Sequence, residues 1–217
     1  MSDKKLALLI GIDYLGSDME LTGCREDVRK VKEILINNLD FKEENIISLT
    51  EDREPKYHPT AMNIINNLGK LIIKAHHNQA DHLFVHYSGH GASILDQDGD
   101  EKDNRDEVIV PLDVNKMGVI TDDFMHDYIA YLPKGCKMFG LFDCCHSGTI
   151  LDLRYRYYGI HNMVEENLKS DIEGDVFMVS GCHDSDVSMS DARKSPKSHD
   201  LKLNLKGVQI ISFWCYL

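Results

Sequence analysis

The sequence predicts an α/β domain of three layers, in which a mainly parallel central sheet is covered by helices on both faces. Apolar segments of strand length alternate along the chain with longer segments in which apolar residues recur every three or four positions. This alternation is typical of β-α-β units, whose strands are buried on both faces. The 217 residues are enough for one well-buried domain, and no linker rich in Pro, Gly or Ser divides them.

The first elements of this domain are expected between residues 5 and 74. Residues 5–12 are nearly all apolar, as a central parallel strand requires, and residues 25–39 show the 3.6-residue period of an amphipathic helix. A short strand is expected at residues 45–49. Thr60 is the expected N-cap of a second helix, which continues to about residue 74.

The middle of the chain contains a third strand and a long acidic segment. The strand is expected at residues 82–87 and runs into the turn Ser-Gly-His-Gly at residues 88–91. Residues 92–107 contain seven acidic side chains and are expected to form an exposed loop. After a short apolar piece, Thr121 is the expected cap of a helix over residues 122–131.

Two further strands are expected toward the C-terminus. Residues 137–142 are apolar and end abruptly at Asp-Cys-Cys-His, as a buried strand does when its tip carries reactive groups. Residues 175–180 form another strand, residues 185–205 are expected to be loop, and residues 208–214 are the last apolar run. The strands therefore bring several polar segments to one edge of the predicted sheet.

Composition argues against some classes of partner. A formal net charge of −12 disfavours nucleic acid and anionic membrane surfaces, and is compatible with basic substrates or bound cations. No apolar run approaches the ~20 residues needed to span a bilayer. The sequence shows no secretory signal. Its six cysteines lack zinc-type spacing, and two of them are adjacent. We therefore expect reduced thiols and a cytoplasmic protein.

Two strand ends carry the residue types of a cysteine hydrolase. Because the carboxyl ends of parallel strands meet at one edge, His90 and Cys145 can meet although they are far apart in the sequence. A thiol becomes nucleophilic when a base or a positive dipole stabilises the thiolate, and a histidine can also protonate the leaving amine. The tight turn around His90 offers backbone N–H groups to an oxyanion.

These residue types leave other interpretations open. A buried cysteine is usually an inert apolar residue, and a strand-end histidine is often only hydrogen-bonded. His146 is a second candidate base, although adjacent side chains on an extended backbone point apart. A zinc site of Cys144, Cys145 and His90 lacks the usual ligand spacing. A cysteine phosphatase would need an arginine soon after the cysteine, and the first one is Arg154.

Three motifs together resemble those of metacaspases, the caspase-like peptidases found outside animals. They are Tyr-Ser-Gly-His-Gly at residues 87–91, Asp-Cys-Cys-His-Ser-Gly at residues 143–148 and Leu-Xaa-Gly-Cys-Xaa-Xaa-Asp at residues 21–27. The resemblance implies a caspase-like, flavodoxin-like three-layer sandwich. It also implies a cysteine endopeptidase domain at residues 1–191, followed by an atypical tail at residues 192–217.

The resemblance implies roles for the strand-end residues. His90 matches the catalytic histidine and Cys145 the nucleophile, which would act through a thioester acyl-enzyme, with Cys144 as a bystander. Backbone N–H groups of Gly91 and Cys145 would form the oxyanion hole.

The resemblance also implies the substrate class, which is protein or peptide with Arg or Lys before the cut. The matching pocket residues are Asp27, Ser88 and Asp143. Two carboxylates in a partly dry pocket favour a guanidinium and repel an acidic side chain. Considered alone, Asp27 would be interpreted as a solvated carboxylate near a helix N-terminus.

Activating calcium is a further implication. In metacaspases similar to this chain the ion is bound by aspartates that match Asp106, Asp122, Asp123 and Asp152. Carboxylates from separated segments suit a hard cation with flexible oxygen coordination. Without the resemblance, Asp122 and Asp123 would be interpreted as first-turn residues that interact favourably with a helix dipole.

The chain departs from the family pattern after Ser-Gly-Cys-His-Asp at residues 180–184. A metacaspase is expected to continue into a small-subunit region that completes the sheet and one wall of the cleft, so we expect a chain truncated after the large-subunit region. Such a chain would have an exposed sheet edge, and we expect a monomer unless a second chain completes the sheet.

Three hypotheses for function follow. The first is a calcium-stimulated cysteine endopeptidase that cleaves after Arg or Lys. The second is a truncated caspase-fold module with weak or no catalysis, which binds partners or regulates them. The third is a cysteine hydrolase of another substrate class on the same scaffold.

Overall fold

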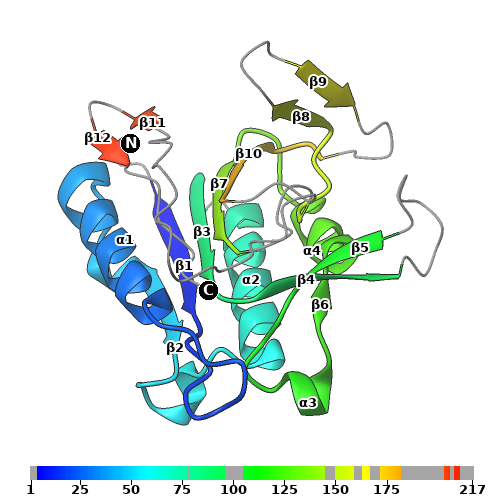
Figure 1. Cartoon of the computed structure of the whole chain (residues 1–217). Helices are drawn as coiled ribbons and strands as arrows, with labels where there is room; N and C mark the ends of the chain where they lie inside the picture. Colours follow the sequence, from blue (N-terminus) through cyan, green and yellow to red (C-terminus); the bar gives the residue numbers. More distant parts are fainter. Residues whose placement is uncertain are drawn as a thin grey trace.

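The computed structural model describes residues 4–77, 79–95, 105–144, 150–158, 163–166, 172–181, 203–205 and 208–210. Its centre is a five-stranded sheet in the order β10-β7-β3-β1-β2 (Figure 1). The strands are β1 Lys5–Gly11, β2 Ile46–Thr50, β3 His82–Ser88, β7 Lys137–Asp143 and β10 Asp175–Ser180. All four neighbouring pairs run parallel, which confirms the predicted sheet.

Three helices cover the sheet, and their ends follow the capping residues in the sequence. They are α1 Cys24–Leu39, α2 Ala61–His76 and α4 Asp122–Ile129. Thr60 accepts a hydrogen bond from the N–H of Asn63 at 3.3 Å, and Thr121 accepts one from Phe124 at 3.2 Å. Both predicted N-caps are therefore confirmed. Shorter helical turns are η1 Glu43–Asn45, η2 Pro55–Tyr57 and α3 Val114–Met117.

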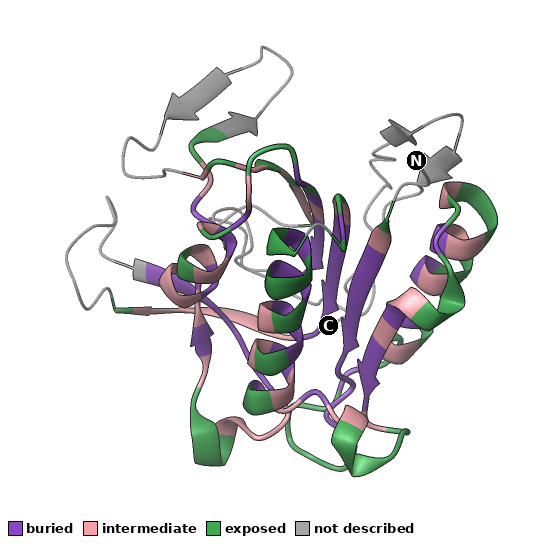
Figure 2. Ribbon diagram, turned by 180° about the vertical axis from the view of Figure 1, so that it is seen from behind, coloured by how far each residue is buried: buried purple, intermediate pink, exposed green. Residues whose placement is uncertain are grey.

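Alternate residues of β1 pack into two different apolar cores, one on each face of the sheet. Leu8 and Ile10 belong to the apolar core that includes α2 and α4, whereas Ala7 and Leu9 belong to the smaller core against α1. Successive side chains of a strand point to opposite faces, so a nearly all-apolar strand fits between two helical layers. Figure 2 shows buried strands between helices whose outer surfaces are exposed. The predicted three-layer sandwich is confirmed.

An antiparallel sheet replaces part of the expected exposed loop at residues 92–107. It consists of β4 Gly91–Leu95, β5 Arg105–Ile109 and β6 Ile120–Thr121. The loop prediction was wrong for its two described ends, because β5 pairs on both sides. Asp106 and Glu107, both on β5, are only 2% and 4% exposed. The charge count misled here because these two carboxylates are buried where β5 packs against β4, β6 and α4.

The remaining described strands form two small hairpins. They are β8 Tyr155–Tyr158 with β9 Met163–Glu166, and β11 Leu203–Leu205 with β12 Val208–Ile210. The loop expected at residues 185–205 therefore contains β11 at its end. At the edge of the main sheet, Phe177 of β10 is 65% exposed. Within the described residues, no helix combines the length and apolar character needed to cross a bilayer.

Candidate active site

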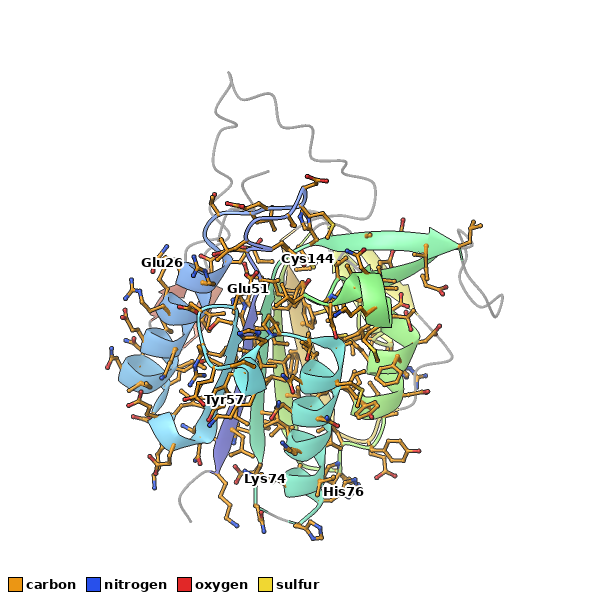
Figure 3. All side chains as sticks on the ribbon, turned by 90° about the horizontal axis from the view of Figure 1, so that it is seen from below. Glu26, Glu51, Tyr57, Lys74, His76 and Cys144 are labelled. Carbon is orange, nitrogen blue, oxygen red and sulfur yellow. The ribbon has the colours of Figure 1, made fainter. Side chains whose placement is uncertain are left out.

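The candidate site lies at the carboxyl edge of the parallel sheet. Register pairs Ser88 at the end of β3 with Asp143 at the end of β7, and the His90 turn follows Ser88 directly. In Figure 3 the labelled Cys144 and Glu51 lie toward this edge, while Lys74 and His76 lie at the opposite end of the sheet. The structure therefore brings the two predicted strand ends together, as parallel topology requires.

His90 is held by its backbone and by its ring. Its N–H donates to the Tyr14 hydroxyl at 3.0 Å, and its carbonyl accepts from the Tyr87 hydroxyl at 2.7 Å and from the N–H of Val110 at 3.2 Å. The imidazole lies 4.8 Å from the Tyr14 ring between centroids, and Nε2 is 2.8 Å from the carbonyl oxygen of Met19. The turn is thus fixed from three segments of the chain.

The contact with Met19 determines which ring nitrogen of a neutral His90 carries the proton. A carbonyl oxygen can only accept, so Nε2 donates and Nδ1 keeps its lone pair. A lone pair on Nδ1 is what a base needs to take the proton of a thiol. The half-buried His90, when neutral, therefore has a defined tautomer with its free lone pair on Nδ1.

The predicted nucleophile Cys145 lies outside the described residues, as does its rival base His146. Among the described residues, the free cysteines Cys24, Cys136 and Cys144 are all buried. Burial raises the pKa of Cys24 to about 12, which makes it a poor nucleophile. The full burial of Cys144 suits the predicted bystander role.

Gly91, one of the two predicted oxyanion-hole residues, opens strand β4 opposite Ile109 of β5. The adjacent pair of His90 and Val110 is hydrogen-bonded, because Val110 N–H donates to His90 O. Hydrogen-bonded and non-bonded pairs alternate along an antiparallel ladder, so the N–H of Gly91 is directed away from β5. The second predicted donor, the N–H of Cys145, lies outside the described residues.

The three predicted pocket residues lie together on the face of the sheet that packs against α1. Ser88 Oγ donates to Asp27 Oδ2 at 3.1 Å, and Asp143 is the register partner of Ser88. Asp27 is half-buried rather than fully solvated, and burial raises its carboxyl pKa, an effect that the Ser88 bond partly opposes. Ser88 and Asp143 are 2% and 5% exposed.

Gly181 makes room for the carboxylate of Asp143, one of the predicted pocket residues. A Cβ at residue 181 would lie 3.0 Å from Asp143 Oδ1, and the N–H of Gly181 donates to Phe142 O at 2.9 Å. The residue that follows β10 therefore lies close to Asp143.

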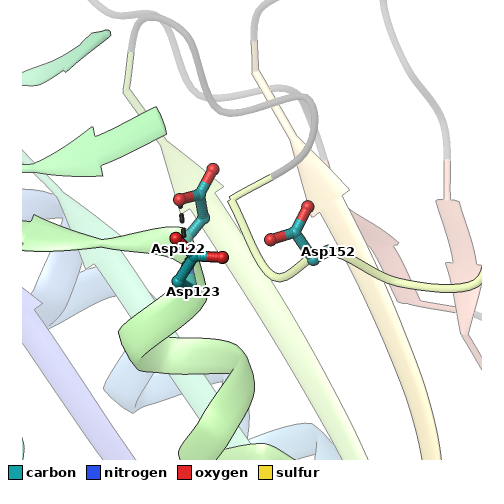
Figure 4. A group of neighbouring side chains, drawn as sticks. All are labelled: Asp122, Asp123 and Asp152. Carbon is teal, nitrogen blue, oxygen red and sulfur yellow. Dashed lines mark hydrogen bonds between the residues drawn. The ribbon is translucent and has the colours of Figure 1, made fainter. Parts of the chain in front are cut away.

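Three of the four predicted calcium ligands form a compact acidic cluster (Figure 4). One carboxylate oxygen from each of Asp122, Asp123 and Asp152 lies within 4.8 Å of the other two. Asp152 faces the first turn of α4 from a separate loop, with a positive φ of 43°. The fourth predicted ligand, Asp106, is not part of this three-residue group, but its charge contributes to raising the pKa of Asp122.

Burial is the main cause of the raised pKa of Asp122, which is 1% exposed. Its two oxygens accept the N–H of Glu107 at 2.7 Å and of Asp123 at 2.9 Å. Desolvated carboxylates this close together repel one another unless a proton or a cation intervenes. The donor set therefore fits a hard divalent cation, because every side chain in it offers carboxylate oxygen.

Several residues of the site had no signal in the sequence. Tyr14 and Met19 are hydrogen-bonded to His90, and Glu51 accepts backbone N–H groups of the loop that carries both of them. Glu107 was grouped with an exposed loop. Only the position of Tyr14, two residues after a predicted strand, could have marked it as a strand-end residue.

The fold and this edge define a caspase-like α/β domain. A solved structure, that of protein GSU0716 from Geobacter sulfurreducens, superposes with a TM-score of 0.56 over 83% of this chain and 74% of that chain. At 23% identity this likeness supports the fold alone.

The chain belongs to the metacaspase family. The family model "Metacaspase, peptidase C14 domain" matches residues 5–154. The chain is 47% identical over 167 residues to Metacaspase-1 of Cryptococcus neoformans and 42% identical over 177 residues to Metacaspase-1 of Candida glabrata. These matches cover 76% and 81% of this chain, but only 36% and 45% of the relatives. The chain therefore spans less than half the length of these curated relatives.

Proposed function

We propose that the chain acts as a calcium-stimulated cysteine endopeptidase that cleaves after Arg or Lys. The observation that carries this proposal is the arrangement of His90, whose Nε2 is engaged by Met19 O, next to the acidic pocket of Asp27 and Asp143. Membership of a peptidase family supports the reaction class. A pure binding module would need neither an oriented imidazole nor the two carboxylates.

In the proposed reaction, His90 Nδ1 takes the thiol proton of Cys145, and the thiolate attacks the scissile carbonyl carbon. The resulting oxyanion would be held by N–H groups of Gly91 and Cys145. The imidazolium then gives its proton to the leaving amine, so that a thioester remains, which water hydrolyses with His90 again as base. The carbonyl of Met19 stabilises the imidazolium that forms between these steps.

The proposed preference for Arg or Lys rests on charge and burial. Asp27 and Asp143 lie near Ser88, on the face of the sheet against α1. A guanidinium or ammonium entering this pocket would be paired with carboxylates that are costly to leave desolvated. An aspartate before the cut would add a third negative charge and be rejected.

We assign the proposed calcium to Asp122, Asp123 and Asp152, with Asp106 as the fourth carboxylate nearby. When bound, the ion would neutralise the cluster and connect the first turn of α4 with the loop that carries Asp152. The binding free energy would then stabilise this arrangement of the two segments.

One assay tests these assignments together. The purified chain is given fluorogenic peptides ending in Arg, Lys or Asp, with calcium or with a chelator. We expect cleavage after Arg and Lys only, stimulated by calcium, lost in Cys145→Ala and His90→Ala and kept in Cys144→Ser. Cleavage after Asp would contradict the pocket assignment, and equal rates in chelator would contradict the calcium assignment.

A caspase-fold binding module with weak or no catalysis is the second candidate. The observation that favours it is Phe177, which is 65% exposed on β10, the outer strand of the sheet. An exposed aromatic on an edge strand is suited to pairing with another chain. Calcium-dependent binding of Arg peptides without turnover would support this module over the peptidase.

A further inference from the structure

Glu51 forms a clamp on the loop that follows β1. It comes directly after β2, and its carboxylate accepts three consecutive backbone N–H groups. Oε2 accepts from Asp13 at 2.6 Å and Tyr14 at 3.0 Å, and Oε1 accepts from Leu15 at 3.0 Å. Hydrogen bonds from neutral donors to an ionised acceptor are stronger than those between neutral groups, and three on one side chain fix the position of the loop.

The clamp favours an unusual backbone conformation at Tyr14. Tyr14 has a φ of +51°, in the left-handed region that side chains other than glycine rarely adopt. Such conformations persist when surrounding contacts determine them. By binding both the N–H of Tyr14 and that of Leu15, Glu51 stabilises the turn in which the Tyr14 side chain is directed toward His90.

The loop makes two of the contacts that orient His90. The Tyr14 hydroxyl accepts the His90 N–H at 3.0 Å, and the Met19 carbonyl accepts from Nε2 at 2.8 Å. These two contacts fix the backbone of the turn and the tautomer of the ring, respectively.

Internal hydrogen bonds connect the clamped end of the loop with Met19. Ser17 Oγ donates to Tyr14 O at 2.8 Å and accepts the Met19 N–H at 3.1 Å. The N–H of Leu21 donates to Asp13 O at 2.7 Å, which closes the loop. The loop therefore behaves as one unit, and a displacement at residues 13–15 would also displace the Met19 carbonyl.

We propose that Glu51 is a positioning residue for the catalytic His90, acting through the loop and not by contact with substrate. This inference rests on the proposed function of His90 as the base. Its effect on the ring tautomer, however, exists whether or not the chain turns over a peptide.

The test compares Glu51→Gln with Glu54→Gln. Glutamine keeps one acceptor oxygen but places an NH₂ group against at least one backbone N–H, so the clamp is broken. Glu54 is an exposed glutamate three residues later whose carboxylate pairs with Lys56, so it is the matched control. In Glu51→Gln we expect kcat on an Arg peptide to fall by about tenfold to a hundredfold at nearly constant KM, because the pocket residues are unchanged. Glu54→Gln should match the parent.

A second readout separates this inference from the proposed function. Nitrogen-15 NMR of the His90 ring reports the tautomer, which should be Nε2-protonated in the parent and mixed in Glu51→Gln. If the parent cleaves no peptide, the peptidase proposal fails, while the tautomer comparison still decides the role of Glu51. An unchanged tautomer and unchanged kcat in Glu51→Gln would overturn the inference, as would an equal change in Glu54→Gln.

Glu51→Asp keeps the negative charge on a shorter side chain and serves if Glu51→Gln does not fold. We expect a smaller change of the same kind, with Tyr14→Phe lowering kcat less in the Glu51→Asp background than in the parent. If the effects of Glu51→Asp and Tyr14→Phe on kcat were fully additive, the two residues would not act on His90 through the same loop, and the inference would be contradicted.

Discussion

His86 lies in the central strand β3, and acidification should destabilise the fold through this side chain. It is fully buried, and its Nδ1 lies 3.1 Å from Leu141 O, to which it donates. Burial lowers the pKa of His86 from 6.5 to about 4, although the bond to the carbonyl opposes this effect. In the unfolded chain the imidazole returns to its ordinary pKa, so the unfolded state binds a proton first as the pH falls.

The size of this effect follows from the two pKa values. Since one pKa unit corresponds to about 1.4 kcal/mol, the difference amounts to about 3 kcal/mol of unfolding free energy. The folded pKa is the lower one, so the penalty is absent above pH 6.5 and grows as the pH falls from 6.5 toward 4. This is a large part of the 5–15 kcal/mol that stabilises a typical domain.

Urea unfolding at several pH values between 7 and 4 measures this dependence. His86→Asn keeps a donor for Leu141 O and cannot titrate, whereas His77→Asn alters an exposed histidine as the control. We expect the parent and His77→Asn to lose about 3 kcal/mol more than His86→Asn over this pH range. Equal pH dependence of the unfolding free energy in all three proteins would contradict the lowered pKa of His86.

Four further predictions concern packing, the pocket and the cation. Gly11→Ala should lower the free energy of unfolding by about 2 kcal/mol in urea, because its Cβ would lie 2.5 Å from Cys24 O. Gly181→Ala should raise KM for Arg peptides, because its Cβ would lie 3.0 Å from Asp143 Oδ1 and displace that carboxylate. Asp27→Asn should lower kcat/KM for Arg peptides about tenfold to a hundredfold. Because burial raises the pKa of Asp27, this variant should also be more stable at neutral pH, a gain that disappears under acid. Asp152→Asn should weaken calcium binding in calorimetry, whereas the exposed control Asp18→Asn should not.

Much of the fold could be predicted because its signals are local. The all-apolar run at residues 5–12 leaves no polar face, so it predicts a strand covered on both sides, and threonine before an apolar period marked two helix starts. The antiparallel sheet could not be predicted in the same way. In the sequence, Asp106 and Glu107 look like residues of a solvated loop. They are buried because β4 and α4 pack against β5, and these contacts are between segments distant in the sequence.

The candidate site also contains some residues that could be predicted from the sequence and others that could not. His90 and Asp143 could be located because parallel strands bring their ends to one edge, and register confirms that Ser88 and Asp143 are neighbours. Glu51 could not be found, because nothing in a lone glutamate after a strand indicates three backbone donors from a distant loop. The nucleophile assigned by resemblance, Cys145, stays a prediction.

Residues 107–110, which include the end of β5 and the residue after it, join the acidic cluster to the His90 turn by continuous backbone. At one end Glu107 N–H donates to Asp122, and at the other Val110 N–H donates to His90 O. If calcium favours one position of β5, it favours the corresponding geometry of the turn. Thermodynamic linkage then requires the reverse effect of equal size, so a substrate analogue bound at His90 should tighten calcium binding by the factor by which calcium tightens binding of the analogue.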